Sequence, residues 1–326
     1  MLANELKESL ERKIAPAYFV FGDDSYLRQT SMDMLISLCG EDFREFNLTV
    51  LDGADVDVKD IIEGISQVPF MSDRRVVVVR DFDKPLSDKE YTSLSNQVKS
   101  LTDCTVVFLK NSGKERAKTN DVSKFCVSVD CSSLNESEVI EFIENTVTKK
   151  GYSISRGTCI KIAKYTSCDL ARVVGEINKL SAFCAETKLI TDVAVDEIVS
   201  RDVEFVVYTL SNAVAERNAK EAYALVEQGR GDSGKSLGML SALTNQFRRM
   251  LHVLLNKGLP PVLLAEHLGV KEFVVTKTLN LALKFKQVRL KAIVDKLVDL
   301  EYLFKSGKIA DANEALFMGV AFALSN

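Results

Sequence analysis

The residues whose types and spacing most suggest chemistry lie at 229–236, where GRGDSGKS matches the phosphate-binding loop pattern GxxxxGK[ST] in full. In such a loop backbone amides bind phosphates, a lysine (here Lys235) reaches the β- and γ-phosphates and a hydroxyl (here Ser236) holds Mg²⁺. This chemistry needs a strand directly before the loop. Residues 218–228 instead carry apolar side chains at helical spacing. A linker between two helices therefore explains the string, and an ATPase that uses Lys235 is the alternative.

A phosphate loop would be expected after the first predicted strand, where residues 22–29 read GDDSYLRQ. The second glycine and the lysine of the pattern are missing there. Asp23 and Asp24 also stand where phosphates would bind, and like charges repel. This loop is predicted to cap the following helix, so the sequence predicts no nucleotide cofactor.

Residues that could hold a metal or act as a general base are few. His252 and His267 are the only histidines, and neither lies beside a cysteine or a carboxylate cluster in the sequence. Asp81 and Asp83 follow a predicted strand and could hold a metal, but basic residues alternate with them, which favours a salt-bridged loop. We expect no catalytic residue and no metal site.

The segment 68–72 (VPFMS) could instead bind a protein partner. It follows an amphipathic helix predicted over 57–66, which Pro69 brings to an end. Phe70 and Met71 then lie in a connecting loop. Two large apolar side chains in a loop are either tucked under the sheet, which physics alone favours, or exposed as an anchor for a partner's pocket.

Alternating strands and helices must position these residues in the first third of the chain. Apolar and β-branched runs predict strands at 18–21, 46–51, 75–80, 105–109 and 125–129. Between them, Val58, Ile61, Ile62 and Ile65 predict a helix, and Ser87 with Glu90 forms a capping box that opens another. This order predicts a parallel sheet with helices on both faces.

After Asp130 the sequence predicts helices alone. Ser133 and Glu136 form a second capping box, and Gly151 ends the helix behind it. Further helices are predicted at 170–183, from 191 to 199, and at 204–227, 237–256, 261–268, 272–285, 288–305 and 311–324. An α/β region is thus followed by a smaller and a larger helical region.

Composition agrees with several ordinary globular domains. The chain has 326 residues, which is longer than a domain with a single core usually is. Its residues are 46% hydrophobic and 27% charged, as in ordinary globular proteins. Residues 206–326 carry 16 basic and 11 acidic side chains, although the whole chain has a net charge of −4. The seven cysteines never form a CxxC pair, and the N-terminus lacks the apolar core of a signal peptide. We expect free thiols, no membrane segment and a cytoplasmic location.

In the order and spacing of several segments, the chain resembles the delta subunit family of the bacterial DNA polymerase III clamp loader. These segments are YFVFGDD at 18–24, VPFMSDRRVVVVRDFDK at 68–84, DLARVVGEINKLSAF at 169–183, LGVKEFVVTKTLNLALKF at 268–285 and LVDLEYLFKSGK at 297–308. The resemblance implies an AAA+-like α/β domain (1–132), a small helical lid domain (133–203) and an all-α collar domain (204–326).

The resemblance also implies a function in DNA replication without a catalytic site or a working phosphate loop. The family inserts an apolar pair into a pocket of the sliding clamp, and Pro69 and Phe70 match that pair, with Met71 beside it. The family's pair is often a branched aliphatic residue followed by Phe, so Pro69 is a departure. The implied partners are the sliding clamp, ATPase subunits in a hetero-pentamer, and primer–template DNA through that complex.

The implied setting is the DNA polymerase III holoenzyme, a nucleotidyltransferase, at the nucleoid of a bacterial cytoplasm. The resemblance favours an exposed Phe70 over the tucked one. Besides the ATPase, an AAA+-like scaffold with another partner is the remaining alternative.

Overall fold

The computed structural model describes residues 1–81, 86–110, 122–227, 229–270 and 272–325. They form two compact units, Met1–Phe142 and Ile143–Asn326. The finer division of the chain into three domains stays a prediction. None of the described helices is long and apolar enough to cross a membrane.

A five-stranded parallel sheet forms the centre of the first unit. Its order is β2-β3-β4-β1-β5. The strands are β1 (Ala17–Phe21), β2 (Leu48–Asp52), β3 (Arg75–Arg80), β4 (Cys104–Leu109) and β5 (Val127–Asp130). All four strand pairs are parallel, as the alternation of strands and helices predicts.

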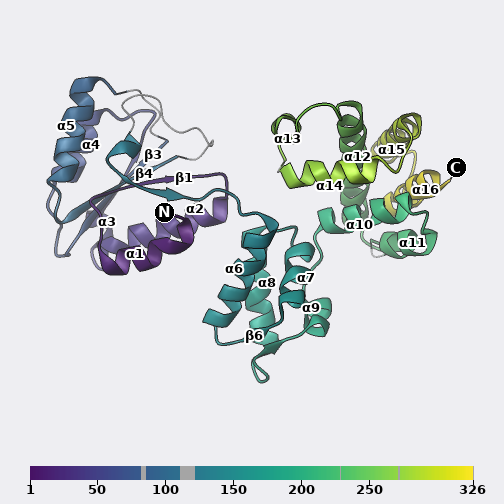
Figure 1. Ribbon diagram of the computed structural model, residues 1–326, viewed down its shortest axis with the longest axis horizontal. Helices are drawn as coiled ribbons and strands as arrows, with labels where there is room; N and C mark the ends of the chain where they lie inside the picture. Colours follow the sequence, from purple (N-terminus) through teal and green to yellow (C-terminus); the bar gives the residue numbers. More distant parts are fainter. Residues whose placement is uncertain (82–85, 111–121, 228, 271, 326) are drawn as a thin grey trace. The chain divides into compact units, whose positions relative to one another are not determined.

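Helices cover both faces of this sheet (Figure 1). They are α1 (Leu6–Arg12), α2 (Ser25–Ile36), the single turn α3 (Arg44–Asn47), α4 (Val58–Ser66) and α5 (Asp88–Lys99). Val77 and Val79 of β3 share a core with Ile61 and Ile65 of α4 and Leu94 of α5. Neighbouring residues of a strand point to opposite faces, and residues 76 and 78 are also buried, so β3 is covered on both sides.

The capping box predicted at Ser133 is wrong by two residues. Helix α6 (Glu136–Lys149) is capped by Asn135, whose side chain accepts a hydrogen bond from the Glu138 amide at 3.0 Å. The Glu138 carboxylate accepts the Asn135 amide at 2.7 Å in return. Both residue pairs satisfy the S/T/N-x-x-E pattern in principle, and the chain uses the second one.

The prediction that strands end at Asp130 is also wrong. In the second unit β6 (Ser153–Ile154) and β7 (Leu189–Ile190) form a two-stranded parallel sheet. Each strand has two residues, which is too short for a periodic pattern to reveal. The sheet links the starts of α7 (Arg156–Tyr165) and α9 (Asp192–Ile198), between which α8 (Leu170–Phe183) lies in the chain.

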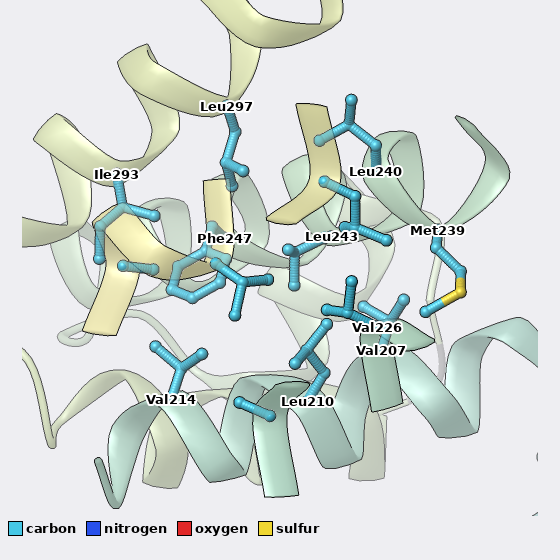
Figure 2. Packing of buried hydrophobic residues seen from close by; sticks show 14 of the residues in the cluster. Val207, Leu210, Val214, Val226, Met239, Leu240, Leu243, Phe247, Ile293 and Leu297 are labelled. Carbon is cyan, nitrogen blue, oxygen red and sulfur yellow. The ribbon is translucent and has the colours of Figure 1, made fainter. Parts of the chain in front are cut away.

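Seven further described helices complete the second unit. They are α10 (Val203–Ala215), α11 (Ala219–Glu227), α12 (Ser233–Leu255), α13 (Pro261–Leu268), α14 (Glu272–Ala282), α15 (Gln287–Lys305) and α16 (Ala312–Leu324). Helix α12 packs against α10, α14, α15 and α16. Its side chains Leu243 and Phe247 point into a core with Leu210, Val214 and Ile293 (Figure 2).

The single helix predicted over 204–227 is two helices in the structure. Arg217 has a left-handed backbone, with φ 56°, which ends α10. The side chain of Asn218 then accepts the Glu221 amide at 3.2 Å and opens α11. The apolar spacing continues across this break, so periodicity alone could not locate it.

Candidate protein-binding surface

Three phenylalanine rings gather on the surface of the first unit. Phe70 contacts Phe43 edge to face, with ring centroids 5.6 Å apart, and contacts Phe46 at 5.2 Å. Phe70 is 47% exposed, Phe43 is 44% exposed and Phe46 is 53% exposed. We call Phe43, Phe46 and Phe70 the aromatic patch. An exposed group of aromatic side chains is typical of a surface that binds another protein.

Phe70 belongs to a loop, residues 67–71, that we call the anchor loop. Helix α4 ends at Ser66, and Gln67 is already extended, with φ −74° and ψ 136°. Pro69 disfavours helical backbone at the residue before it, which keeps this part of the chain extended. Met71 then turns the chain with a left-handed φ of 49° and leaves its side chain 74% exposed.

A buried asparagine holds the anchor loop. The side chain of Asn47, at the end of α3, is fully buried. Its Oδ1 accepts the backbone N–H of Phe70 at 2.7 Å, and its Nδ2 donates to the Phe70 carbonyl at 2.8 Å. The same Nδ2 lies 3.2 Å from the carbonyl of Phe43. One side chain thus joins the backbones of two residues of the patch.

A buried arginine supports the patch from β3. The guanidinium of Arg75 donates to the carbonyl of Phe46, to Oγ1 of Thr49 at 2.6 Å and to the carbonyl of Gly64 at 3.2 Å. These acceptors belong to α3, β2 and α4. A buried charge is costly unless it is hydrogen-bonded, so Arg75 ties these three elements together.

The structure brings the predicted site residues together with two that the sequence analysis missed. Phe70 is half-exposed, Met71 is exposed and Pro69 is partly buried. Phe43 and Phe46 were missed because a strand was predicted from residue 46, whereas residues 44–47 form a helical turn and β2 begins at Leu48. The spacing i, i+3 of the two rings was the available signal.

The loop after β1 caps a helix, as predicted. Oδ1 of Asp24 accepts the backbone N–H of Leu27 at 3.0 Å, so the carboxylate occupies the place a phosphate would take. The carboxylate of Asp23 accepts the Ser133 amide at 2.7 Å. Gly22 has a φ of 133°, and a Cβ there would lie 2.1 Å from the Cys131 carbonyl carbon. Only glycine therefore fits.

The phosphate-loop pattern at 229–236 follows helix α11 and runs into the first turn of α12. Asp232 caps α12 by accepting the Lys235 amide at 2.9 Å, and the buried hydroxyl of Ser236 donates to the Gly229 carbonyl at 2.9 Å. Lys235 and Ser236 therefore lie in the first turn of α12. This helix begins at Ser233, four residues before the predicted start at 237. The element before the pattern is the helix α11, whereas a phosphate loop requires a strand at this place.

The remaining candidates from the sequence are the possible metal ligands and the two histidines. Within the described ranges, no three His, Cys, Asp or Glu residues are close enough to hold a metal ion. Asp83, considered above with Asp81, lies outside the described residues. His252 and His267 belong to α12 and α13.

Comparisons with known proteins agree with this fold. Residues 18–131 match the family model of the DNA polymerase III delta subunit, and residues 204–318 match that of its C-terminal domain. Together the two models cover more than two thirds of the chain. The DNA polymerase III subunit delta of Bacillus subtilis is 22% identical over 94% of this chain and 93% of its own length.

Solved structures include a close match in fold. The DNA clamp loader delta protein of Bacillus subtilis superposes with a TM-score of 0.84 at 23% identity, over 99% of this chain and 100% of its own. The RuvB Holliday junction branch migration motor of Thermotoga maritima matches at a TM-score of 0.38 and 13% identity, over 86% and 85% of the two chains, which supports no inference.

The fold is thus a parallel α/β domain followed by helices, as in the DNA clamp loader delta protein of Bacillus subtilis. The chain belongs to the family of DNA polymerase III delta subunits. It therefore has a role in DNA replication and acts in a complex with other DNA polymerase III subunits.

Proposed function

We propose that this chain binds the sliding clamp through the anchor loop and the aromatic patch and favours the opened ring. The observation that carries the proposal is the Phe70 ring, which stays half-exposed although its backbone is fixed by Asn47. A fixed backbone reduces the entropy that binding costs, and an exposed aromatic ring supplies apolar area. Met71 and Pro69 extend the same surface.

The magnitude of the patch limits how much it can do alone. Burying a whole Phe side chain is worth about 1.5–3 kcal/mol, so the exposed halves of three rings supply about 3 kcal/mol together. Moving the ring-shaped clamp from 1% to 99% open needs about 5.5 kcal/mol of differential binding between its open and closed states. The chain would thus shift the ring toward opening by about two decades at most through this patch. The rest must come from other contacts, including those of the partner subunits.

Residues 204–326 would form the collar that joins ATPase subunits in a hetero-pentamer, behind a lid at 133–203 and a clamp-binding domain at 1–132. Their helices expose apolar side chains, including Val262, Leu263, Val288 and Phe317, which support a role in assembly. The chain itself would be non-catalytic and would meet primer–template DNA through the complex.

Clamp opening can be measured directly. The cognate sliding clamp, carrying a fluorophore pair across one ring interface, is titrated with the purified chain. We expect a saturable rise in the open fraction that the Phe70→Ala variant produces only at higher concentration. Binding to the clamp without opening would restrict the chain to a tether. Failure to bind the clamp at all would favour an AAA+-like scaffold with another partner, and ATP hydrolysis dependent on Lys235 would favour the ATPase.

A further inference from the structure

The hydrogen bonds of Asn47 are directed at the backbone that carries the aromatic patch. Its Oδ1 and Nδ2 pair with the N–H and the carbonyl of Phe70, and Nδ2 also donates to the carbonyl of Phe43. The side chain is fully buried, whereas the rings on either side of it are half-exposed. A paired donor and acceptor fix both the position and the orientation of the Phe70 peptide groups.

Side chains, not strand or helix ladders, hold the segment between α4 and β3. Within the described chain, no backbone–backbone hydrogen bond joins residues 67–74 to any other residue. Asn47 holds this segment at Phe70, and Oγ of Ser72 donates to the Cys39 carbonyl at 2.9 Å. Between these two attachments Met71 has a left-handed backbone, a conformation that persists only where its surroundings impose it.

From this geometry we propose that Asn47 is a positioning residue for clamp binding, acting through Phe70. The inference rests on the proposed function of the anchor loop. Without the amide of Asn47, the nearest hydrogen bonds that hold the anchor loop would be those of Ser72 and Arg74. The Phe70 ring would then sample orientations that a pocket cannot accept. The loop would then lose conformational freedom on binding, and this entropic cost would weaken the affinity for the clamp.

A double-mutant cycle with Asn47→Ala and Phe70→Ala tests this in the full chain. The measured quantity is the affinity for the cognate sliding clamp, expressed per folded molecule. We expect Asn47→Ala to weaken binding by about fivefold or more, since each lost hydrogen bond is worth roughly twofold to tenfold. In the Phe70→Ala background the same change should cost less than about twofold, because coupled residues are not additive.

Two further measurements separate positioning from simple stability. Amide hydrogen exchange of the 67–72 segment should become faster in Asn47→Ala, while the strands of the sheet keep their protection. Asn47→Asp keeps the acceptor for the Phe70 N–H and loses the donor, so its affinity should lie between those of the wild type and Asn47→Ala. It also completes the cycle if Asn47→Ala does not fold. Asn96→Ala, at an exposed position of α5, is the matched control.

The outcomes distinguish the two claims. If Phe70→Ala binds the clamp as the wild type does, the proposed function of the anchor loop is wrong. If Phe70→Ala weakens binding but Asn47→Ala does not, or if Asn47→Ala costs the same in both backgrounds, the positioning role is overturned.

Discussion

At the scale of residues, the surface around Phe70 inverts the usual distribution of polar and apolar groups. Asn47 and Arg75 are buried, and the rings of Phe43, Phe46 and Phe70 are half-exposed. Buried polar groups stabilise a fold only when their hydrogen bonds are satisfied. Here Asn47 bonds to the backbone of Phe70, and Arg75 directs one of its hydrogen bonds at the Phe46 carbonyl. The cost of this arrangement is justified if another protein covers the rings.

Phe46→Ala tests the extent of that surface. The ring is half-exposed, and the hydrogen bond from Arg75 goes to the Phe46 backbone carbonyl. Truncation of the side chain therefore leaves this hydrogen bond in place. We expect clamp affinity to fall by about threefold to tenfold, for about 1 kcal/mol of lost burial. Isothermal titration of the variant with the clamp measures this. Unchanged affinity would confine the contact surface to the anchor loop.

The cysteines provide a prediction that involves pH. All seven are reduced thiols, and six are buried. Burial raises the pKa of Cys104 and of Cys159 from 9.0 to about 11. Because the thiolate is the reactive form, only about one in a thousand of these groups is ionised at pH 8.

Alkylation of the folded chain at pH 8 should therefore label the half-buried Cys126 first and the other six only on unfolding. Above about pH 9 the unfolded-state thiols ionise while those of Cys104 and Cys159 do not, so stability should fall between pH 9 and about 11. Mass spectrometry of labelled peptides checks the order. Rapid labelling of Cys104 in the folded chain would contradict the burial.

At the scale of elements, local patterns predicted most of the strands and helices because their signals are local. Ser87 caps α5 as predicted, and β3 is buried on both faces as its valines indicate. The missed elements depend on contacts distant in sequence. The two residues of β6 form a strand only because β7, 36 residues later, pairs with them. The turn α3 was hidden by β-favouring residues that continue into β2.

The candidate site also contains residues that local sequence reveals and residues that only the fold reveals. Phe70 and Met71 could be found from the apolar residues after Pro69. The role of Asn47 could not, since it lies 23 residues from Phe70 in sequence and meets it only through the fold.

The start of α12 is tested by a pair of substitutions. Asp232→Ala removes the cap on the Lys235 amide and should cost about 1 kcal/mol of unfolding free energy. Lys235→Ala removes an exposed side chain and should leave both the melting temperature and clamp loading unchanged. Thermal denaturation with and without ATP measures the stability of both variants. Stabilisation by ATP that Lys235→Ala abolishes would restore the ATPase hypothesis.

At the scale of the whole molecule, we propose that clamp contact and assembly belong to different units. The aromatic patch lies entirely within the unit Met1–Phe142. The helices from α10 onward lie in the other unit and are net basic, with 16 basic against 11 acidic residues over 206–326. Charge of opposite sign in the two parts of one chain is consistent with different partners for each.

Removal of the residues after 203 should separate the two functions. The 1–203 fragment keeps β1–β5 and the whole patch, so we expect clamp binding within about threefold of the full chain. It should fail to join the ATPase subunits in size-exclusion chromatography. Circular dichroism must first show that the fragment is folded. A folded fragment that still enters the complex would move the assembly surface out of residues 204–326.

The most direct test of the account is the affinity of Phe70→Ala for the cognate sliding clamp, measured together with its melting temperature. Phe183→Ala is the matched control, since Phe183 is 52% exposed at the end of α8 in the other unit. Loss of a central aromatic contact should weaken clamp binding by at least about tenfold, while the half-exposed ring should cost the fold only about 1 kcal/mol. Phe183→Ala should bind as the wild type does. Wild-type affinity per folded molecule of Phe70→Ala, with or without a loss of stability, would contradict the account.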